Sequence, residues 1–134
     1  TSSCGRLFDA ASALLNICTV SNYEGQAAML LESKVTEPRV LENGWFIENH
    51  QLNLLPILEY LLNCDPEEGA NFFHGTLVAA LADWVMNFSH QFNSHDLLLA
   101  GGCFLNKPLS EGLIQTLAAR RVKARLPMQV PVND

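Results

Sequence analysis

Two adjacent glycines, Gly101 and Gly102, mark the point in this sequence where a ligand could come closest to the backbone. They follow the short apolar run 96–100, which is typical of a buried strand, and they precede helical periodicity over 104–121. Glycine admits a ligand close to the main chain, and the start of the following helix offers unpaired N–H groups. Asn106 would lie one turn into that helix, within reach of the same ligand. An ordinary tight turn explains the same pattern and is the simpler interpretation.

Two further polar segments could contribute to a binding site. Asp9 follows an apolar pair near the start of a predicted helix, where its carboxylate could accept hydrogen bonds from a ribose diol. Glu24, Gly25 and Gln26 form a polar turn that opens a second helix. The simpler interpretations are favourable helix electrostatics or a pair with Arg6 for Asp9, and a routine connector for the turn. Taken singly, neither segment indicates a function.

The side chains that most often hold metals or act as nucleophiles are scattered along the chain. No two histidines have the i, i+4 spacing that lets two imidazoles share an ion on one helix. No two cysteines have CxxC spacing, so we expect four reduced thiols that pack as small apolar side chains. The residues concerned are His50, His74, His90, His95, Cys4, Cys18, Cys64 and Cys103.

The elements that must position these residues alternate between helices and short strands. Asp65 is a suitable N-cap for the longest predicted helix, with Pro66 at its first position. A strand, a glycine turn, a helix and a second strand form a βαβ-like unit, whose turn is compatible with a nucleotide. The spacing of apolar residues predicts a first helix capped by Ser2 or Ser3, further helices over 24–32, 57–62, 72–90 and 104–121, and strands at 45–47, 96–100 and 122–126, with 52–55 as a partner strand or a helix entry.

Composition bounds the classes of protein that fit. The 134 residues suit one domain, and 49% hydrophobic residues exclude an intrinsically disordered chain. The net charge of −6 argues against nucleic acid as the main partner. No apolar run is long enough for a membrane span and no secretory signal is visible, so we expect a cytoplasmic protein without a membrane partner. The absent initiating Met and the final turn residues 133–134 suggest a piece of a longer protein.

Five short motifs carry a resemblance to a known family. They are TSSCGRLFDA at 1–10, YEGQAAM at 23–29, FH at 73–74, AGGCFLN at 100–106 and PVND at 131–134. In this order they resemble the carboxyl-terminal part of the HypF carbamoyltransferases of [NiFe]-hydrogenase maturation, across essentially the whole chain. The chain is similar, more distantly, to the tRNA threonylcarbamoyl transferases, which favour a Pro-Gly-Gly turn in place of YEGQ, and to antibiotic O-carbamoyltransferases.

The resemblance implies a fold and a reaction. The expected fold class is α/β and helix-rich, with residues 1–134 as a single fragment forming the second half of an actin/sugar-kinase/Hsp70-like (ribonuclease H-like) domain. The implied reaction passes a carbamoyl group from carbamoyl-adenylate, made from ATP, to the carboxyl-terminal cysteine of a HypE-type acceptor protein. The remaining HypF domains would belong to the same chain, so we expect this fragment to be inactive alone.

The resemblance also implies roles for individual residues. Asp9 would hold the ribose of the adenylate, and Asp134 or its neighbour would approach a metal-bound phosphate or carbamoyl end. The divalent metal (zinc, iron or magnesium) would be held mostly by residues outside this chain, so none of the four histidines takes that role. The other expected nucleotide contacts are Glu24, Gly25, Gln26, Gly101, Gly102 and Asn106.

Two alternatives stay open at the level of the sequence. The chain could be a noncatalytic ATP-binding or sugar-kinase-like module that keeps the fold and lacks the reaction. It could also be a helical scaffold or interaction domain without a ligand. The scaffold interpretation predicts solvent-filled, unpaired surroundings for Gly101 and Gly102, and no strand before them.

Overall fold

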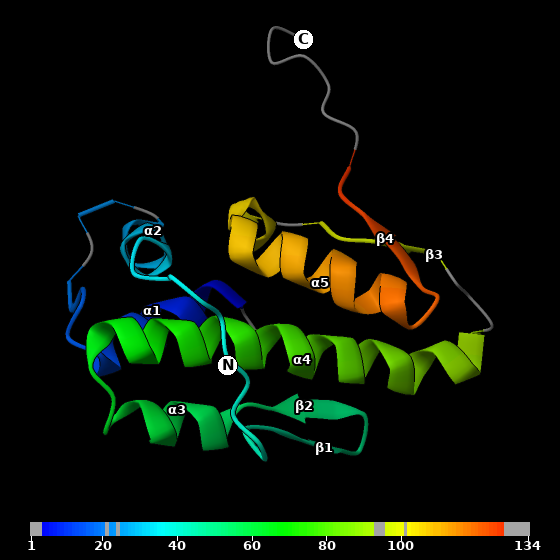
Figure 1. Cartoon of the computed structure of the whole chain (residues 1–134), viewed down its shortest axis with the longest axis horizontal. Coiled ribbons are helices and arrows are strands. Elements are labelled where there is room, and N and C mark those ends of the chain that lie inside the picture. Colours follow the sequence, from blue (N-terminus) through cyan, green and yellow to red (C-terminus); the bar gives the residue numbers. More distant parts are fainter. Residues whose placement is uncertain (1–3, 21, 24, 93–95, 101, 128–134) are drawn as a thin grey trace, which may run out of the picture.

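The computed structural model describes residues 4–20, 22–23, 25–92, 96–100 and 102–127, with the backbone alone for 89–92. Helices dominate this part of the chain and the strands are short, in agreement with the predicted helix-rich α/β class (Figure 1). In chain order, the elements are α1 Cys4–Leu14, α2 Gln26–Glu32, β1 Phe46–Glu48, β2 Gln51–Asn53, α3 Leu55–Leu61, α4 Pro66–Phe92, β3 Asp96–Leu98, the 3₁₀ helix η1 Gly102–Leu105, α5 Lys107–Ala119 and β4 Lys123–Arg125.

The long helix α4 is the central element against which the others pack. In Figure 1, α2 and α5 lie on one side of it, and α3 and the hairpin β1–β2 lie on the other, while α1 lies beside it and contacts both α2 and α3. The helix begins where the sequence predicts, because the Asp65 carboxylate accepts a hydrogen bond from the Glu68 N–H at 2.8 Å. The helix continues on both sides of the range 72–90 over which apolar periodicity was recognised. A helix with neighbours on several sides is apolar around much of its circumference, as this one is.

The hairpin β1–β2 is fastened to α4 by two tryptophans. Its strands pair antiparallel, and its turn residues Asn49 and His50 both have positive φ angles, the geometry of a type I′ turn. The Trp84 indole N–H donates to the His50 carbonyl at 2.8 Å, and the Trp45 indole N–H donates to the Asp83 carboxylate at 3.0 Å. The segment 52–55, which the sequence left open, serves both purposes: the strand ends at Asn53 and the helix begins at Leu55.

The predicted βαβ-like unit is confirmed at the end of the chain. Strands β3 and β4 pair in parallel, and η1 and α5 connect them. Two details of the prediction are wrong. The helix over 104–121 is interrupted, because Asn106 is extended and caps α5 instead of lying one turn inside a helix. The strand is not buried on both faces, because Leu98 is 60% exposed while Leu99 is 5% exposed. In the part of the chain that the structure describes, this sheet has two strands, and α5 covers one face of it.

Two groups of buried apolar side chains form the core. The larger one joins α1, α3 and α4, where the rings of Phe8 and Phe73 meet edge to face with 5.2 Å between centroids. The smaller one lies beneath the sheet β3–β4 and includes Leu113 and Leu117 of α5. Among the described residues, no helix is both long enough and apolar enough to cross a membrane.

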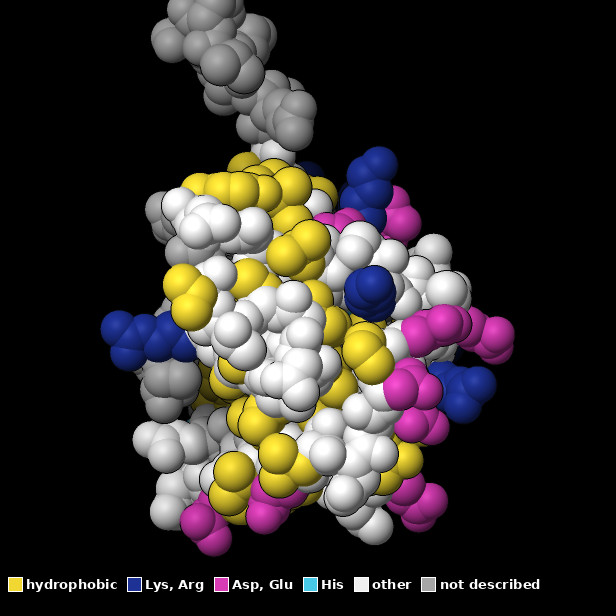
Figure 2. Space-filling model, turned by 90° about the vertical axis from the view of Figure 1, so that its left-hand side faces the viewer, with side chains coloured by type: hydrophobic (Ala, Val, Ile, Leu, Met, Phe, Trp, Pro, Cys, Tyr) yellow, Lys and Arg dark blue, Asp and Glu magenta, His cyan; other side chains and the backbone are white. Residues whose placement is uncertain are grey.

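The surface at the end formed by α1, α2 and the start of α4 is mixed. Figure 2 shows apolar side chains reaching the surface at separate points there, with Asp and Glu gathered toward one edge. Single exposed apolar side chains are normal for a folded protein. This surface therefore gives no evidence for a particular partner.

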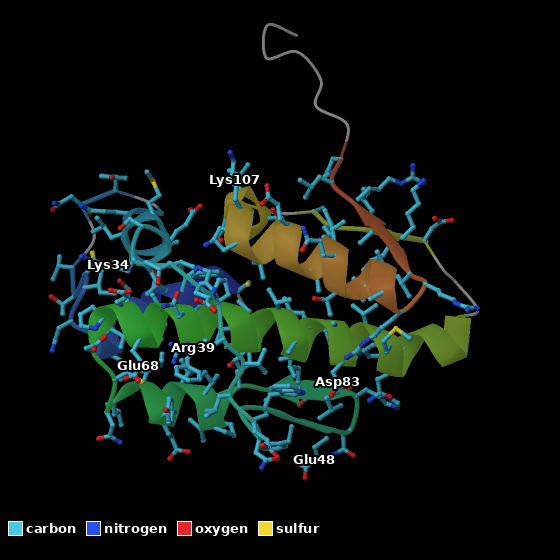
Figure 3. All side chains as sticks on the ribbon, viewed as in Figure 1. Lys34, Arg39, Glu48, Glu68, Asp83 and Lys107 are labelled. Carbon is cyan, nitrogen blue, oxygen red and sulfur yellow. The ribbon has the colours of Figure 1, made fainter. Side chains whose placement is uncertain are left out.

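The loop before the hairpin is held against α4 by polar contacts and by one glycine. The Asn71 side-chain oxygen accepts hydrogen bonds from the backbone of residues 36–37, and the Asn71 carbonyl accepts one from the Arg39 N–H at 3.0 Å. Figure 3 shows Arg39 on this segment, where its guanidinium lies 5.8 Å from the centre of the Phe72 ring. A Cβ atom at Gly75 would lie 2.0 Å from the Arg39 carbonyl oxygen. The backbone of the loop therefore occupies the place of a side chain on α4.

We expect Gly75→Ala to lower the free energy of unfolding by about 1–3 kcal/mol, because backbone atoms must move to admit the methyl group. Gly112→Ala in α5 is the matched control. Its Cβ would meet only the Val78 side chain, at 3.1 Å, and alanine is the better helix former. Urea denaturation monitored by circular dichroism measures both. Equal unfolding midpoints for the two variants would contradict the close approach at Gly75.

Candidate functional site

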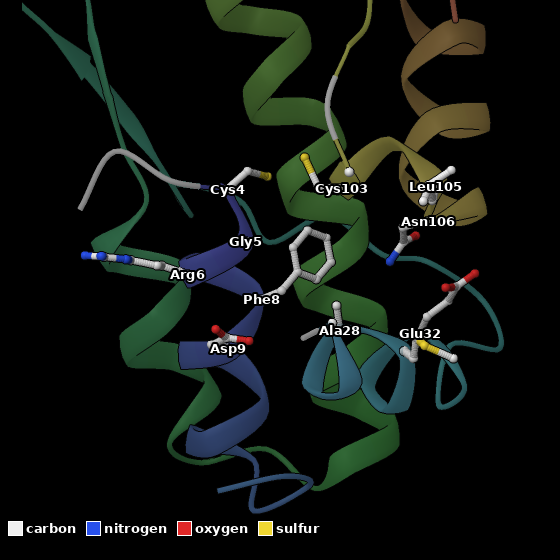
Figure 4. A pocket seen from close by; sticks show the side chains of 13 residues that line it. Cys4, Gly5, Arg6, Phe8, Asp9, Ala28, Glu32, Cys103, Leu105 and Asn106 are labelled. Atoms are coloured by element: carbon white, nitrogen blue, oxygen red, sulfur yellow. The ribbon is translucent and has the colours of Figure 1, made fainter. Parts of the chain in front are cut away.

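A cavity of about 890 Å³ opens where α1, α2, η1 and the start of α5 meet (Figure 4). Its volume lies within the range of sites that bind small molecules and cofactors. The lining combines apolar side chains with carboxylates, one amide and one guanidinium, and in Figure 4 Arg6 points away from the middle of the group. The lining residues are Cys4, Gly5, Arg6, Phe8, Asp9, Gly25, Ala28, Met29, Glu32, Gly102, Cys103, Leu105 and Asn106.

The structure brings four of the predicted site residues together around this cavity. Asp9 comes from α1, Gly25 precedes α2, Gly102 begins η1, and Asn106 caps α5. They are as far apart in the sequence as residues 9 and 106, yet they share one concave surface. A strand, β3, precedes Gly102, so one prediction for a scaffold without a ligand is wrong, whereas the exposed position of Gly102 agrees with its other prediction of open surroundings. The roles of the four residues in binding stay predictions.

The other predicted site residues do not add to this surface. Gln26 is absent from the cavity lining described above, and its side-chain oxygen accepts a hydrogen bond from the Asn22 N–H at 2.6 Å instead. Glu24, Gly101 and Asp134 lie outside the described residues. Within the part of the chain that the structure describes, no group of three or more His, Cys, Asp or Glu side chains could hold a metal ion.

Helical spacing explains how α2 reaches the cavity. The residues that line the cavity follow Gly25 by three, four and seven positions, so they lie on one face of the helix; they are Ala28, Met29 and Glu32. Gly25 itself has φ of 84°, a left-handed conformation that glycine adopts without steric cost. The glycine is thus explained by the backbone turn that starts α2. Glu32 was missed by the sequence analysis, although its spacing from Gly25 indicates the same face.

Gly102 lacks the close contacts that explain glycine elsewhere in the fold, as at Gly69 and Gly75. Among the described residues, a Cβ atom built on Gly102 would meet no atom within 4 Å. Gly102 is exposed and faces the open cavity. The chain's own packing therefore tolerates a side chain there, while a ligand seated in the cavity would not.

Asn106 forms hydrogen bonds to two neighbours at the edge of the cavity. Its side-chain oxygen accepts a hydrogen bond from the Leu109 N–H at 3.0 Å and so caps α5. Its amide nitrogen lies 2.9 Å from Nε2 of His74, a fully buried histidine of α4. Nδ1 of the same ring lies 2.9 Å from the Ala70 carbonyl oxygen. His74 belongs to the motif at 73–74, but its partner Asn106 was not foreseeable from spacing.

Two cysteines border the cavity from opposite elements. Cys4 of α1 and Cys103 of η1 point toward one another in Figure 4, and both are free thiols. Burial, and secondarily the neighbouring Cys103, raises the pKa of Cys4 to about 12. Its thiol therefore stays protonated at neutral pH, and protonated thiols are poor nucleophiles. Both positions fall inside the motifs at 1–10 and 100–106, which was the available signal for them.

Burial also lowers the pKa of His74, although its hydrogen bond to Ala70 acts in the opposite sense. The ordinary pKa of a histidine side chain is 6.5, so the ring is neutral at pH 7. In acid, the unfolded chain takes up a proton here that the folded chain does not take up. Stability is therefore lost as the pH falls below about 6.5.

We expect the acid-induced loss of stability that His74 causes to disappear in His74→Gln, since glutamine does not titrate. The difference in unfolding free energy between the parent and the variant should shift by up to about 1.4 kcal/mol per pH unit below pH 6.5. Urea denaturation of both proteins from pH 8 to pH 5 gives this difference, and the other three histidines cancel in it. Parallel pH profiles would show that His74 titrates normally.

Comparison with solved structures supports the observed arrangement. The crystal structure of full-length HypF in its phosphate- and nucleotide-bound form superimposes on 97% of this chain with a TM-score of 0.81 and 28% sequence identity. The crystal structure of HypF from T. kodakarensis superimposes on 93% of the chain with a TM-score of 0.78. At 24% identity the second match shows the fold alone. In these two structures the matched part is 18% and 17% of the solved chain.

Sequence comparison reaches the same relatives. Carbamoyltransferase HypF of Rhizobium leguminosarum bv. viciae is 41% identical over 138 residues, and carbamoyltransferase HypF2 of Cupriavidus necator is 36% identical over 165 residues. All of this chain is matched in both, and it spans 18% and 20% of their lengths. The family model described as the second subdomain of the carbamoyltransferase Kae1-like domain matches residues 1–134. The chain therefore belongs to the HypF carbamoyltransferase family, as the second subdomain of its Kae1-like domain.

Proposed function

We propose that this chain supplies the nucleoside-binding side of a carbamoyl transfer site within a longer HypF-type protein. The reaction passes the carbamoyl group of carbamoyl-adenylate to the carboxyl-terminal cysteine of a HypE-type acceptor during [NiFe]-hydrogenase maturation. The observation that carries the proposal is the shared cavity, lined by Asp9, Gly25, Gly102 and Asn106 from four separate elements. Family membership supports the reaction class.

The cavity suits the adenosine part of such a substrate. Apolar side chains such as Phe8 and Ala28 can cover the base, and the Asp9 carboxylate can accept hydrogen bonds from the ribose diol. The open space before Gly102 lets the ligand approach the backbone. These groups bind and orient the adenylate and keep water from its reactive anhydride.

The transfer itself needs no nucleophile from this chain. The acceptor's thiolate attacks the carbamoyl carbon, a C–S bond forms, and the C–O bond to the phosphate breaks, so AMP leaves. This is consistent with the protonated state of Cys4, which makes that thiol a poor competitor for the carbamoyl group. A divalent metal, when bound, would offset negative charge on the phosphate. Its expected ligand in this chain, Asp134, stays a prediction.

The wider fold relationship and the location of the protein are also proposals. The parallel strands β3 and β4 with their connecting helix α5 are consistent with half of an actin/sugar-kinase/Hsp70-like domain. A cytoplasmic location and the absence of nucleic-acid and membrane partners are expected from the composition. A noncatalytic ATP-binding or sugar-kinase-like module remains the alternative in a different class. Release of pyrophosphate from ATP by the full-length protein only when carbamoyl phosphate is present would argue against it.

We expect Gly102→Val in the full-length protein to reduce acceptor carbamoylation at least tenfold, because its side chain would occupy the cavity. Stability should change little, since a Cβ at this position meets no neighbour within 4 Å. Mass spectrometry of the acceptor's carboxyl-terminal peptide measures transfer, and pyrophosphate release in the same reaction reports adenylate formation elsewhere in the chain.

Asp9→Asn tests the proposed ribose contact by the same assay. The substitution keeps the size of the side chain and removes its charge, so we expect transfer to fall about tenfold with unchanged pyrophosphate release. Glu111→Gln is the matched control, an exposed carboxylate of α5 that does not line the cavity. Wild-type transfer rates in both Asp9→Asn and Gly102→Val would remove the site assignment.

A further inference from the structure

The hydrogen bond between His74 and Asn106 forms a polar link between α4 and the start of α5, and the donor and acceptor in this link can be assigned in only one way. A backbone carbonyl only accepts hydrogen bonds and a backbone N–H only donates them. Since Nδ1 of His74 faces the Ala70 carbonyl, that nitrogen carries the hydrogen and Nε2 is an acceptor. Since the Asn106 oxygen faces the Leu109 N–H, its NH₂ group faces Nε2 and donates to it. Both ends of the link therefore fix the histidine tautomer and the orientation of the amide.

The surroundings hold this link rigidly. His74 is fully buried and Asn106 is 6% exposed. The rings of Phe8 and Phe73 lie edge to face against the imidazole, with centroid distances of 5.6 and 5.7 Å. With aromatic rings against it and hydrogen bonds at both nitrogens, the imidazole has one orientation. A hydrogen bond shielded from water in this way is strengthened.

The Asn106 amide has one hydrogen left over. A side-chain NH₂ group carries two hydrogens, and His74 accepts one of them. Within the described part of the chain, no other acceptor bonds this nitrogen. Asn106 lines the cavity, and Figure 4 shows its amide directed toward the middle of the lining residues. The second hydrogen is therefore available to an acceptor on a ligand in the cavity.

Building on the nucleotide site proposed above, we propose that His74 is a positioning residue that orients Asn106 to donate its second amide hydrogen to an acceptor atom of the bound nucleoside. His74 does not touch the ligand. It fixes which end of the amide faces the cavity: without an acceptor at Nε2, the amide loses the contact that directs its NH₂ group. The ligand group recognised in this way is a ring nitrogen of the base or an oxygen of the sugar.

The test measures nucleotide binding at this segment of the full-length protein. The photoreactive probe 8-azidoadenosine 5′-monophosphate is cross-linked over a range of concentrations, and labelled peptides of this segment are quantified by mass spectrometry. His74→Phe keeps a ring of similar size and removes the acceptor. We expect the half-labelling concentration to rise about tenfold, the effect of one oriented hydrogen bond. His74→Gln, which offers an acceptor and a donor, should stay within about threefold of the parent.

Two controls separate positioning from folding. Phe72→Leu shortens a core side chain of α4 whose ring packs against Tyr60 and not against the imidazole of His74, so half-labelling should be unchanged. Asn106→Asp keeps the cap of α5 and removes the amide hydrogens, so it should weaken labelling at least as much as His74→Phe even if that variant folds poorly.

The outcomes distinguish this inference from the proposed function. Parent-like labelling in His74→Phe or Asn106→Asp, or an equal loss in Phe72→Leu, overturns the positioning role and leaves the nucleotide site standing. Absence of specific labelling of this segment in the parent protein overturns the nucleotide site, and the positioning role with it.

Discussion

The hydrogen-bonded link between α4 and α5 is the constraint on which the cavity depends. It is the polar contact through which the central helix sets the start of α5, and the start of α5 forms one wall of the cavity. Burying the imidazole of His74 and the amide of Asn106 is unfavourable unless their nitrogen and oxygen atoms find hydrogen-bond partners. Here both imidazole nitrogens, the amide oxygen and the amide nitrogen each have one. Because the ring of His74 also packs against Phe8, the same residue joins α1, α4 and α5. The cavity walls are therefore connected through one side chain of the core.

The glycines of this chain illustrate two physical reasons for the absence of a side chain. At Gly75 the space is filled by the backbone of a neighbouring loop, so glycine is required for the fold. At Gly102 the space is empty, so glycine is not required by any contact within the described residues. A position that is free of side-chain atoms without a packing reason is suited to close approach by another molecule. The contrast supports a binding role for Gly102 and a structural one for Gly75.

The small sheet β3–β4 is covered by α5 on one face and carries an exposed leucine, Leu98. Its two strands pair with the register of a parallel sheet, and the helix that connects them packs on one face. Leu98, which points away from that face, is largely exposed. The chain spans about a fifth of the length of its curated relatives. A site built at the edge of such a unit can hold one side of a ligand, and this is the role proposed for it.

The sequence by itself determined the kinds of element, their order and the family. Helical periodicity, the Asp65 cap and the β-α-β order were all readable because they depend on residues close together in the chain. The motifs at 1–10, 23–29 and 100–106 pointed to Asp9, Gly25, Gly102 and Asn106, and the structure places these residues around one cavity. The tertiary structure decided the rest. The contact of His74 with Asn106 depends on how α4 lies against α5, since the two residues are 32 positions apart in the sequence. The exposure of one face of β3 likewise depends on which segments pack against the sheet. Local propensity carries no information about such contacts, because they form only when distant segments pack.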